Sequence, residues 1–265
     1  LFITVSGLTG GHSGIEINRG RANAVVLLGR ILDAIGRATT MRLCSVSGGS
    51  KDNAIPVSAC ATLVVENRGR AEYAVADGAI TVSAQSGQDA GVPMDADTTR
   101  RALTLLQCAP NGVQEMSREV EGLVQTSLNL GILTTSADSV RASFCVRSNI
   151  NSQKEMLLRR LELLSAVLGG TFSISGDYPA WEYSADSPLR RLMAEVFAEQ
   201  CGHAPTVEVI HAGVECGLLA DKLSGLDCVS IGPDLTEIHT PRERMHIASV
   251  QRTWALLTET LRRLR

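Results

Sequence analysis

The stretch Val209–Leu223, V-I-H-A-G-V-E-C-G-L-L-A-D-K-L, and the later stretch Glu237–Met245, E-I-H-T-P-R-E-R-M, decide which fold we expect for the C-terminal part of the chain. Each of them places a histidine, His211 or His239, where a strand-like apolar run gives way to turn residues that include Gly or Pro. Side chains at the end of a strand lie at the edge of a sheet, where ligands usually bind. We therefore expect both turns to belong to one functional site, of which this chain holds only a part.

Around these turns, helix-like and strand-like segments alternate. Helices are expected over 187–201, 213–223 and 247–265, and strands over 206–210 and 228–231. This alternation is typical of an α/β layer. The rhythm changes near 177–186, and we therefore predict two domains, 1–178 and 179–265.

The N-terminal part contains strands, a hairpin and helices. Leu1–Leu8 is strand-like and breaks into G-L-T-G-G-H-S-G, whose glycines permit positive φ and place His12 on a tight loop. Two β-rich runs, Gly122–Thr135 and Ser139–Ser148, are joined by a short polar turn and predict a hairpin. The spacing of leucines over Asn151–Leu168 predicts a helix, and a further strand is expected over 171–175.

The composition argues against several kinds of partner. The 265 residues are 44% hydrophobic and 20% charged, as in ordinary globular proteins, and a net charge of −3 with a pI near 6.0 is unlike that of nucleic-acid binders. No apolar run reaches transmembrane length, so no membrane partner is expected. The seven cysteines are odd in number, scattered and without a C-x-x-C pair, which favours a cytoplasmic protein with buried thiols over a disulfide framework.

His239 is the strongest candidate for a metal ligand. Imidazole is the commonest protein ligand for metals, and Pro241 stiffens the loop that carries this histidine. Glu237 or Glu243 could accept a hydrogen bond from the other ring nitrogen. The alternative is an ordinary histidine in a surface turn.

The segment from His211 to Gly217 follows a strand-like run and opens a predicted helix. Glu215 would then lie in the first helical turn, where it is either an ordinary helix-start glutamate or a neighbour of free N–H groups that bind a substrate carboxylate. A helix start can also lower the pKa of a thiol, but no second group marks Cys216 as an activated nucleophile.

Two polar residues of the N-terminal part are further candidates. His12 is either a turn residue or a mobile hydrogen-bond donor suited to a developing oxyanion. Arg147 ends a β-rich run and is either a solvated charge or, through its planar guanidinium, a clamp for a substrate's terminal carboxylate.

Several metal-binding patterns are absent from the sequence. A two-metal hydrolytic site requires several carboxylates and histidines around ions about 3.5–4 Å apart. The chain has no H-x-D, no H-E-x-x-H and no adjacent pair of glutamates. We therefore do not expect it to assemble such a site alone.

Six blocks of the sequence resemble a known family, the aminoacyl-histidine dipeptidases, also called Xaa-His or cytosol non-specific dipeptidases, which are carnosinase-like di-zinc exopeptidases. The blocks follow the family's order along nearly the whole chain: Gly10–Asn23, Gly48–Pro56, Pro110–Ser117, Val124–Ile132, Tyr178–Trp181 and His211–Gly217. One departure is Leu128, which stands where the family usually has a polar residue.

The resemblance implies an α/β protein made of two parts. An α+β lid and dimerisation domain with a mainly antiparallel sheet would cover residues 1–178, and the C-terminal part of an α/β zinc-exopeptidase catalytic domain would cover 179–265. The family's first catalytic half, which carries most metal ligands and the general base, has no counterpart in the chain. Because the sequence opens on Leu1 without a methionine, a fragment is the expected explanation.

The resemblance also implies roles for single residues. His12 would be catalytic, reaching across a homodimer to stabilise the tetrahedral intermediate. A dipeptide substrate would be held by Asn129 and Arg147, while His211 and Glu215 would line the same pocket. His239 would be the last ligand of a two-zinc site, for which manganese or cobalt would also suit.

Two hypotheses of different classes follow. The first is the C-terminal portion of a homodimeric, cytoplasmic metallo-dipeptidase that hydrolyses Xaa-His and other dipeptides with a metal-activated water, the 265-residue chain alone being inactive. The second is a non-catalytic dimerisation or binding module derived from the lid domain.

Overall fold

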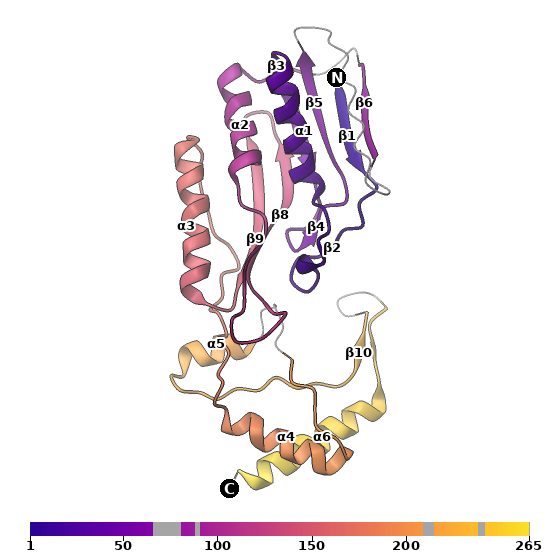
Figure 1. Cartoon of the computed structure of the whole chain (residues 1–265), viewed down its shortest axis with the longest axis vertical. Helices are drawn as coiled ribbons and strands as arrows, with labels where there is room; N and C mark the ends of the chain where they lie inside the picture. The colour runs from indigo at the N-terminus through magenta and orange to yellow at the C-terminus, as the bar shows by residue number, and fades with distance from the viewer. Residues whose placement is uncertain (66–80, 88–90, 209–214, 238–241, 265) are drawn as a thin grey trace. The chain divides into compact units, whose positions relative to one another are not determined.

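The computed structural model describes residues 1–65, 81–87, 91–208, 215–237 and 242–264 (Figure 1). The chain separates after Asp177 into two compact units. The fold of the first unit is built on a sheet, whereas that of the second is built on helices.

A seven-stranded antiparallel sheet forms the centre of the first unit. Its order is β6, β1, β5, β3, β8 and β7, with β9 also paired to β8. A separate short pair, β2 (Gly11–His12) and β4 (Ala54–Ile55), stands beside it. The strands of the large sheet are β1 (Phe2–Ser6), β3 (Met41–Gly48), β5 (Ala59–Val65), β6 (Thr81–Gln85), β7 (Gly112–Met116), β8 (Val124–Thr135) and β9 (Val140–Ser148).

Three helices lie along one face of this sheet: α1 (Ala24–Ala38), α2 (Ala96–Cys108) and α3 (Asn151–Val167) (Figure 1). Leu128 packs against α3 and Leu130 joins the core under α1. Side chains two residues apart on a strand point to the same side of the sheet. The contacts of Leu128 and Leu130 therefore place α3 and α1 on the same face.

The core under α1 is aliphatic, as the low aromatic content requires. The buried side chains of α1 recur three or four positions apart, which is the period of one helix face, and they face the sheet. Burial of each such side chain stabilises the fold by about 1.5–3 kcal/mol. They are Val25, Leu28, Leu32 and Ile35, packed with Ile3, Val5, Leu43, Val46 and Leu63 of the strands.

The sequence predictions for this unit are confirmed for the hairpin and the leucine-rich helix. β8 and β9 pair in antiparallel register from Thr126↔Ser148 to Thr135↔Val140, and α3 ends within a residue of its expected end. The strand expected over 171–175 is wrong, since that segment has no regular structure. Its aromatic residue, Phe172, packs against Leu128 and the buried leucines of α3. The segment is therefore held by this side-chain contact and not by pairing with another strand.

One edge of β8 changes partner along its length. β7 pairs with its first half, from Met116↔Val124 to Gly112↔Leu128, and β3 pairs with its second half at Gly48↔Leu133. β9 pairs with β8 along nearly its whole length, including residues that also pair with β7 or β3. Since one residue cannot pair with two strands on the same edge, β9 must lie on the opposite edge of β8. Between the two partners, residues 129–132 of β8 have no strand on that edge in the described part of the chain.

The second unit contains α4 (Pro188–Cys201), α5 (Glu215–Lys222), α6 (Ile247–Arg263) and a short pair of strands, β10 (Leu235–Thr236) and β11 (Arg244–Met245). α4 and α6 are joined by Arg263, whose guanidinium contacts Glu199 of α4 and, at 2.7 Å, Glu259 of its own helix. Hydrogen bonds from Arg262, the largest cause, and from Arg263 lower the pKa of the Glu259 carboxyl to about 2.

The helix–strand alternation predicted for this unit holds for the helices and is wrong for the strands. Residues 228–231 and 206–208 form no strand, and 209–210 lie outside the described residues. Both segments have the β-branched composition of strands, but a strand exists only where a neighbour pairs with it. Val207 and Ile231 are accordingly 56% and 41% exposed. The described residues thus show mixed helices and a mainly antiparallel sheet, without the α/β layer.

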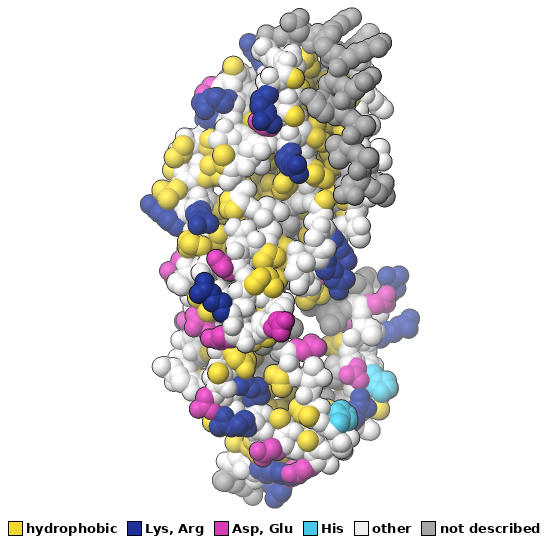
Figure 2. Space-filling model, viewed as in Figure 1, with side chains coloured by type: hydrophobic (Ala, Val, Ile, Leu, Met, Phe, Trp, Pro, Cys, Tyr) yellow, Lys and Arg dark blue, Asp and Glu magenta, His cyan; other side chains and the backbone are white. Residues whose placement is uncertain are grey.

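Apolar side chains remain exposed along α6. Those of its outer stripe recur at alternating spacings of three and four residues, as on one face of a helix. Figure 2 shows apolar side chains among the charged ones on the visible face of this unit. The stripe consists of Ile247, Val250, Trp254, Leu257 and Leu261, continued by Leu264. Separately, none of the described helices is both long and apolar enough to cross a membrane.

Two glycines of α1 provide a test of the α1–α2 contact. A Cβ on Gly29 would lie 2.9 Å from the Cβ of Leu106 in α2, whereas a Cβ on Gly36 would make only ordinary contacts of 3.7 Å. Gly36→Ala should raise stability by about 0.5–1 kcal/mol, because alanine loses less backbone entropy in a helix. Gly29→Ala should instead lower it by about 1–3 kcal/mol through overpacking. Thermal unfolding followed by circular dichroism measures both, and stabilisation by both changes would contradict the close approach of the helices.

Candidate functional site

His12 lies on a turn that the short pair β2–β4 holds in place. Gly11 faces Ile55 and His12 faces Ala54 in antiparallel register. Gly10 and Gly11 have φ of 67° and 143°, which side chains rarely adopt. A Cβ on Gly11 would also overlap the guanidinium of Arg21. The glycines of this loop are therefore required by its backbone shape.

Glu16 clamps the same turn. Its Oε2 accepts a hydrogen bond from the backbone N–H of His12 at 2.9 Å, and its Oε1 accepts from Arg21 at 2.8 Å and from Arg19 at 3.0 Å. Arg21 also donates to the carbonyl of Gly10. The backbone hydrogen bond from His12 is the largest cause that lowers the pKa of the Glu16 carboxyl, and both arginines lower it further. Glu16, at the start of the 3-10 turn Ile17–Arg19, thus joins both sides of the loop.

The imidazole of His12 has a defined orientation. Its Nδ1 accepts hydrogen bonds from the backbone N–H groups of Gly14 at 3.1 Å and Ile15 at 3.3 Å. In the neutral ring an accepting Nδ1 requires the proton to be on Nε2, which makes Nε2 a donor. This is the form that an oxyanion stabiliser needs, and the catalytic role expected for His12 stays a prediction.

Asn129 and Arg147 share one face of the β8–β9 hairpin. Arg147 lies opposite Ser127, two positions along β8 from Asn129, and its side chain is partly buried. Asn129 is only 1% exposed, and its amide donates to the carbonyls of Asp52 and Ala54 at 2.9 Å each. The structure therefore brings Asn129 to the segment that pairs with the His12 turn. The substrate-binding roles expected for Asn129 and Arg147 stay predictions.

The remaining candidates belong to the second unit. Glu215 is exposed in the first turn of α5, and His211 and His239 lie outside the described residues. Burial is the largest cause that raises the pKa of the Cys216 thiol, which disfavours the nucleophilic thiolate. Within the described ranges, no three His, Cys, Asp or Glu side chains are grouped so that they could hold a metal ion. This part of the chain does not by itself fit a metal centre.

The sequence predictions missed the polar residues that support the His12 turn. Glu16 and Arg21 lie in the same glycine-rich block as His12, but nothing local marks their pairing. Asn23 caps α1 by accepting from the N–H groups of Val25 and Val26, a role that the N-cap preference for asparagine could have predicted. Its contact with Asn129, 106 residues away, has no local signal.

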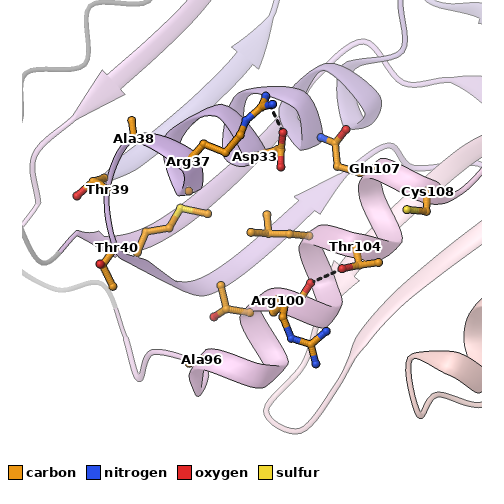
Figure 3. Close-up of a pocket in the computed structure, with 14 residues that line it drawn as sticks. Asp33, Arg37, Ala38, Thr39, Thr40, Ala96, Arg100, Thr104, Gln107 and Cys108 are labelled. Atoms are coloured by element: carbon orange, nitrogen blue, oxygen red, sulfur yellow. Dashed lines mark hydrogen bonds and ion pairs between the residues drawn. The ribbon is translucent and has the colours of Figure 1, made fainter.

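An open hollow of about 700 Å³ lies between the C-terminal end of α1 and α2, and contains none of these residues (Figure 3). Arg37 turns toward Asp33 of its own helix, 2.8 Å away, and Arg100 likewise pairs with Asp97. Because these cations are already paired, the hollow offers no clear ligand-binding chemistry.

Acid should loosen the His12 turn through Glu16. A carboxyl with a lowered pKa contributes stability above its ordinary pKa of 4.5, and loses it as the pH falls through the lower folded value. The backbone amide resonance of His12 should therefore titrate with a midpoint below 4.5, and Glu16→Gln should abolish that titration. Nuclear magnetic resonance measures both, and a midpoint at or above the ordinary value would contradict the clamp.

Comparison with known proteins identifies similar sequences and a similar fold. A family model described as a peptidase dimerisation domain matches residues 3–76. The cytosol non-specific dipeptidase of Escherichia coli (strain K12) is 34% identical over an alignment of 277 positions, which covers 99% of this chain and 57% of that protein. The solved structure of aminoacylhistidine dipeptidase from Vibrio alginolyticus superposes with a TM-score of 0.85 at 31% identity, over 97% of this chain and 55% of that one.

The chain thus spans little more than half the length of the relatives that it matches. The resemblance inferred from the six sequence blocks is confirmed, as is the mixed fold with a mainly antiparallel sheet. By sequence and by fold, nearly the whole chain is similar to part of a cytosol non-specific dipeptidase and to part of an aminoacylhistidine dipeptidase.

Proposed function

We propose that the protein containing this chain is a cytoplasmic, metal-dependent dipeptidase that hydrolyses Xaa-His and other dipeptides. Residues 1–178 would serve as its lid and dimerisation domain, and residues 179–265 as the C-terminal part of its catalytic domain. The observation that carries the proposal is the relationship to dipeptidases along 99% of the chain. It is supported by the ordered His12 turn, which a donor to a reaction intermediate requires.

In this proposal the chain binds and orients the substrate. The Nε2–H of His12 would donate to the oxyanion of the tetrahedral intermediate, and Arg147 would hold the terminal carboxylate of the dipeptide. His211 and Glu215 would line the same pocket. Zinc is the proposed metal, two ions per site, with manganese or cobalt as substitutes and His239 as this chain's ligand. Since the described residues form no metal cluster, the other ligands would have to come from outside them.

The proposal includes a homodimer, supported by the match to a dimerisation domain over residues 3–76. The strands that this segment contributes to the large sheet, β1, β5 and β3, have β6 beside them on one side and β8, at Gly48↔Leu133, on the other. A paired strand edge cannot accept another strand. A second copy would therefore not pair with the edge of β1 that β6 covers.

Loss of the His12 imidazole should slow the chemical step. We expect His12→Ala in the whole protein to lower kcat by roughly 10²–10³-fold with little change in KM, as for removal of one oxyanion donor. His203→Ala is the matched control, because His203 is an exposed histidine whose ring contacts Phe197. Steady-state kinetics on a carnosine-like dipeptide would decide, and an unchanged kcat in His12→Ala would remove His12 from the mechanism.

Replacement of Arg147 should affect substrate binding and the choice of substrate. A charged hydrogen bond contributes about 1.5–3 kcal/mol, so Arg147→Ala should raise KM by roughly 10-fold to 100-fold for a dipeptide with a free carboxylate. A dipeptide amide, which lacks that carboxylate, should be affected far less. Arg141→Ala, an exposed arginine on the same strand, is the control. Equal losses on both substrates would show that Arg147 does not read the carboxylate.

The alternative function is a non-catalytic dimerisation or binding module, which the match of a dimerisation domain to residues 3–76 favours. The two functions differ in the coding sequence upstream of Leu1. A reading frame that continues into an H-x-D block supports the peptidase, and a start codon at this point supports the module.

A further inference from the structure

The segment 52–56 lies between the His12 turn and β8, and its carbonyls are bonded on both sides. The carbonyls of Asp52 and Ala54 accept from the amide of Asn129 at 2.9 Å each. The carbonyl between them, that of Asn53, accepts from the N–H of Ser13 at 2.9 Å. This alternation is that of a β-strand with a partner on each edge. One partner is the His12 turn, and the other is a single side chain.

Asn129 can play this part because its own orientation is determined. Its Oδ1 accepts from the Nδ2 of Asn23 at 3.2 Å, so its NH₂ group must face the two carbonyls. Rotation of the amide by half a turn would set an oxygen against two carbonyl oxygens. Asn23 is itself fixed, because its Oδ1 caps α1 and its Nδ2 also donates to the carbonyl of Leu130 at 3.0 Å.

The backbone of β8 approaches the same segment closely. A Cβ on Gly131 would overlap the backbone of Asp52, and a Cβ on Gly49 would overlap the carbonyl of Gly131. Only a glycine at position 131 therefore allows the turn to lie against β8. This contact occurs within residues 129–132, where that edge of β8 meets neither β7 nor β3.

We propose that Asn129, oriented by Asn23, is a positioning residue that fixes segment 52–56 and, through the β4–β2 pair, the imidazole of His12. Only an asparagine suits the position. Leucine would leave the carbonyls of Asp52 and Ala54 without this donor, aspartate would turn a carboxylate toward them, and glutamine is one methylene too long. The effect on catalysis rests on the proposed function of His12, whereas the effect on the turn does not.

The test compares exchange of backbone amides in the His12 turn among variants of the whole protein. Hydrogen–deuterium exchange of a peptide covering residues 10–16 reports on the N–H groups of Ser13, Gly14 and Glu16, which are hydrogen-bonded in the turn. We expect Asn129→Ala and Asn129→Asp to speed this exchange by about 10-fold or more. Thr126→Val is the matched control, since it removes another part-buried side-chain hydrogen bond of β8, to Ser148, and should leave exchange in the turn within about 2-fold of the parent.

Gly131→Ala provides a second route should the Asn129 variants fail to fold. It keeps the amide of Asn129 but pushes segment 52–56 away from β8, and should speed the same exchange, whereas Gly36→Ala should not. Exchange in residues 10–16 that is as slow in the Asn129 and Gly131 variants as in Thr126→Val would overturn the positioning role.

Kinetics separate this inference from the proposed function. If Asn129 positions a catalytic His12, Asn129→Asp should lower kcat more than it raises KM. Faster exchange together with an unchanged kcat would uphold the positioning of the turn and contradict the catalytic role of His12.

Discussion

Among the described residues, no strand pairs with the β7- and β3-facing edge of β8 between Leu128 and Leu133, and the buried backbone groups there must be satisfied in another way. The N–H of Leu130 donates to Asn111 at 2.8 Å, and the carbonyl of Leu130 accepts from Asn23. These side chains replace the missing strand. In the same interval Gly131, which has no side chain, lies directly against Asp52 of the segment that pairs with the His12 loop. The candidate site is thus a consequence of a gap in the sheet.

Asn23 links this gap to the hydrophobic core. Its oxygen caps α1, whose buried face supplies the core of the first unit, while its NH₂ group holds Asn129 and Leu130. Loss of Asn23 would therefore disturb the start of α1 and the His12 turn together. The Glu16–Arg21 clamp differs, since both side chains are between a fifth and a quarter exposed. Solvent screens the attraction between the two charges, so this ion pair contributes only modestly to the stability of the loop.

What the sequence could predict depends on how local each signal is. Three predictions rest on residues that are close together in the sequence, and the structure contains all three elements. They are the helix α3, the hairpin of β8 and β9, and the glycine loop of His12. The strands expected at 171–175 and 228–231 have strand-like composition, but pairing depends on a distant neighbour and is absent there. The contact of Asn23 with Asn129 spans 106 residues, so neither residue alone could reveal it.

Strand pairing also limits how copies of this chain could associate, because an edge that is already paired cannot accept another strand. The dimerisation domain matched over residues 3–76 contributes β1, β5 and β3, with β1 and β3 at its borders. In this chain β6 pairs with β1 from Phe2 to Ser6 at the first border, whereas β8 pairs with β3 at Gly48↔Leu133 at the second. The strand that covers β3 is also the one whose unpaired interval carries Asn129 and receives the 52–56 turn. A second copy that displaced β8 from β3 would therefore also disturb the turn that we propose to position His12.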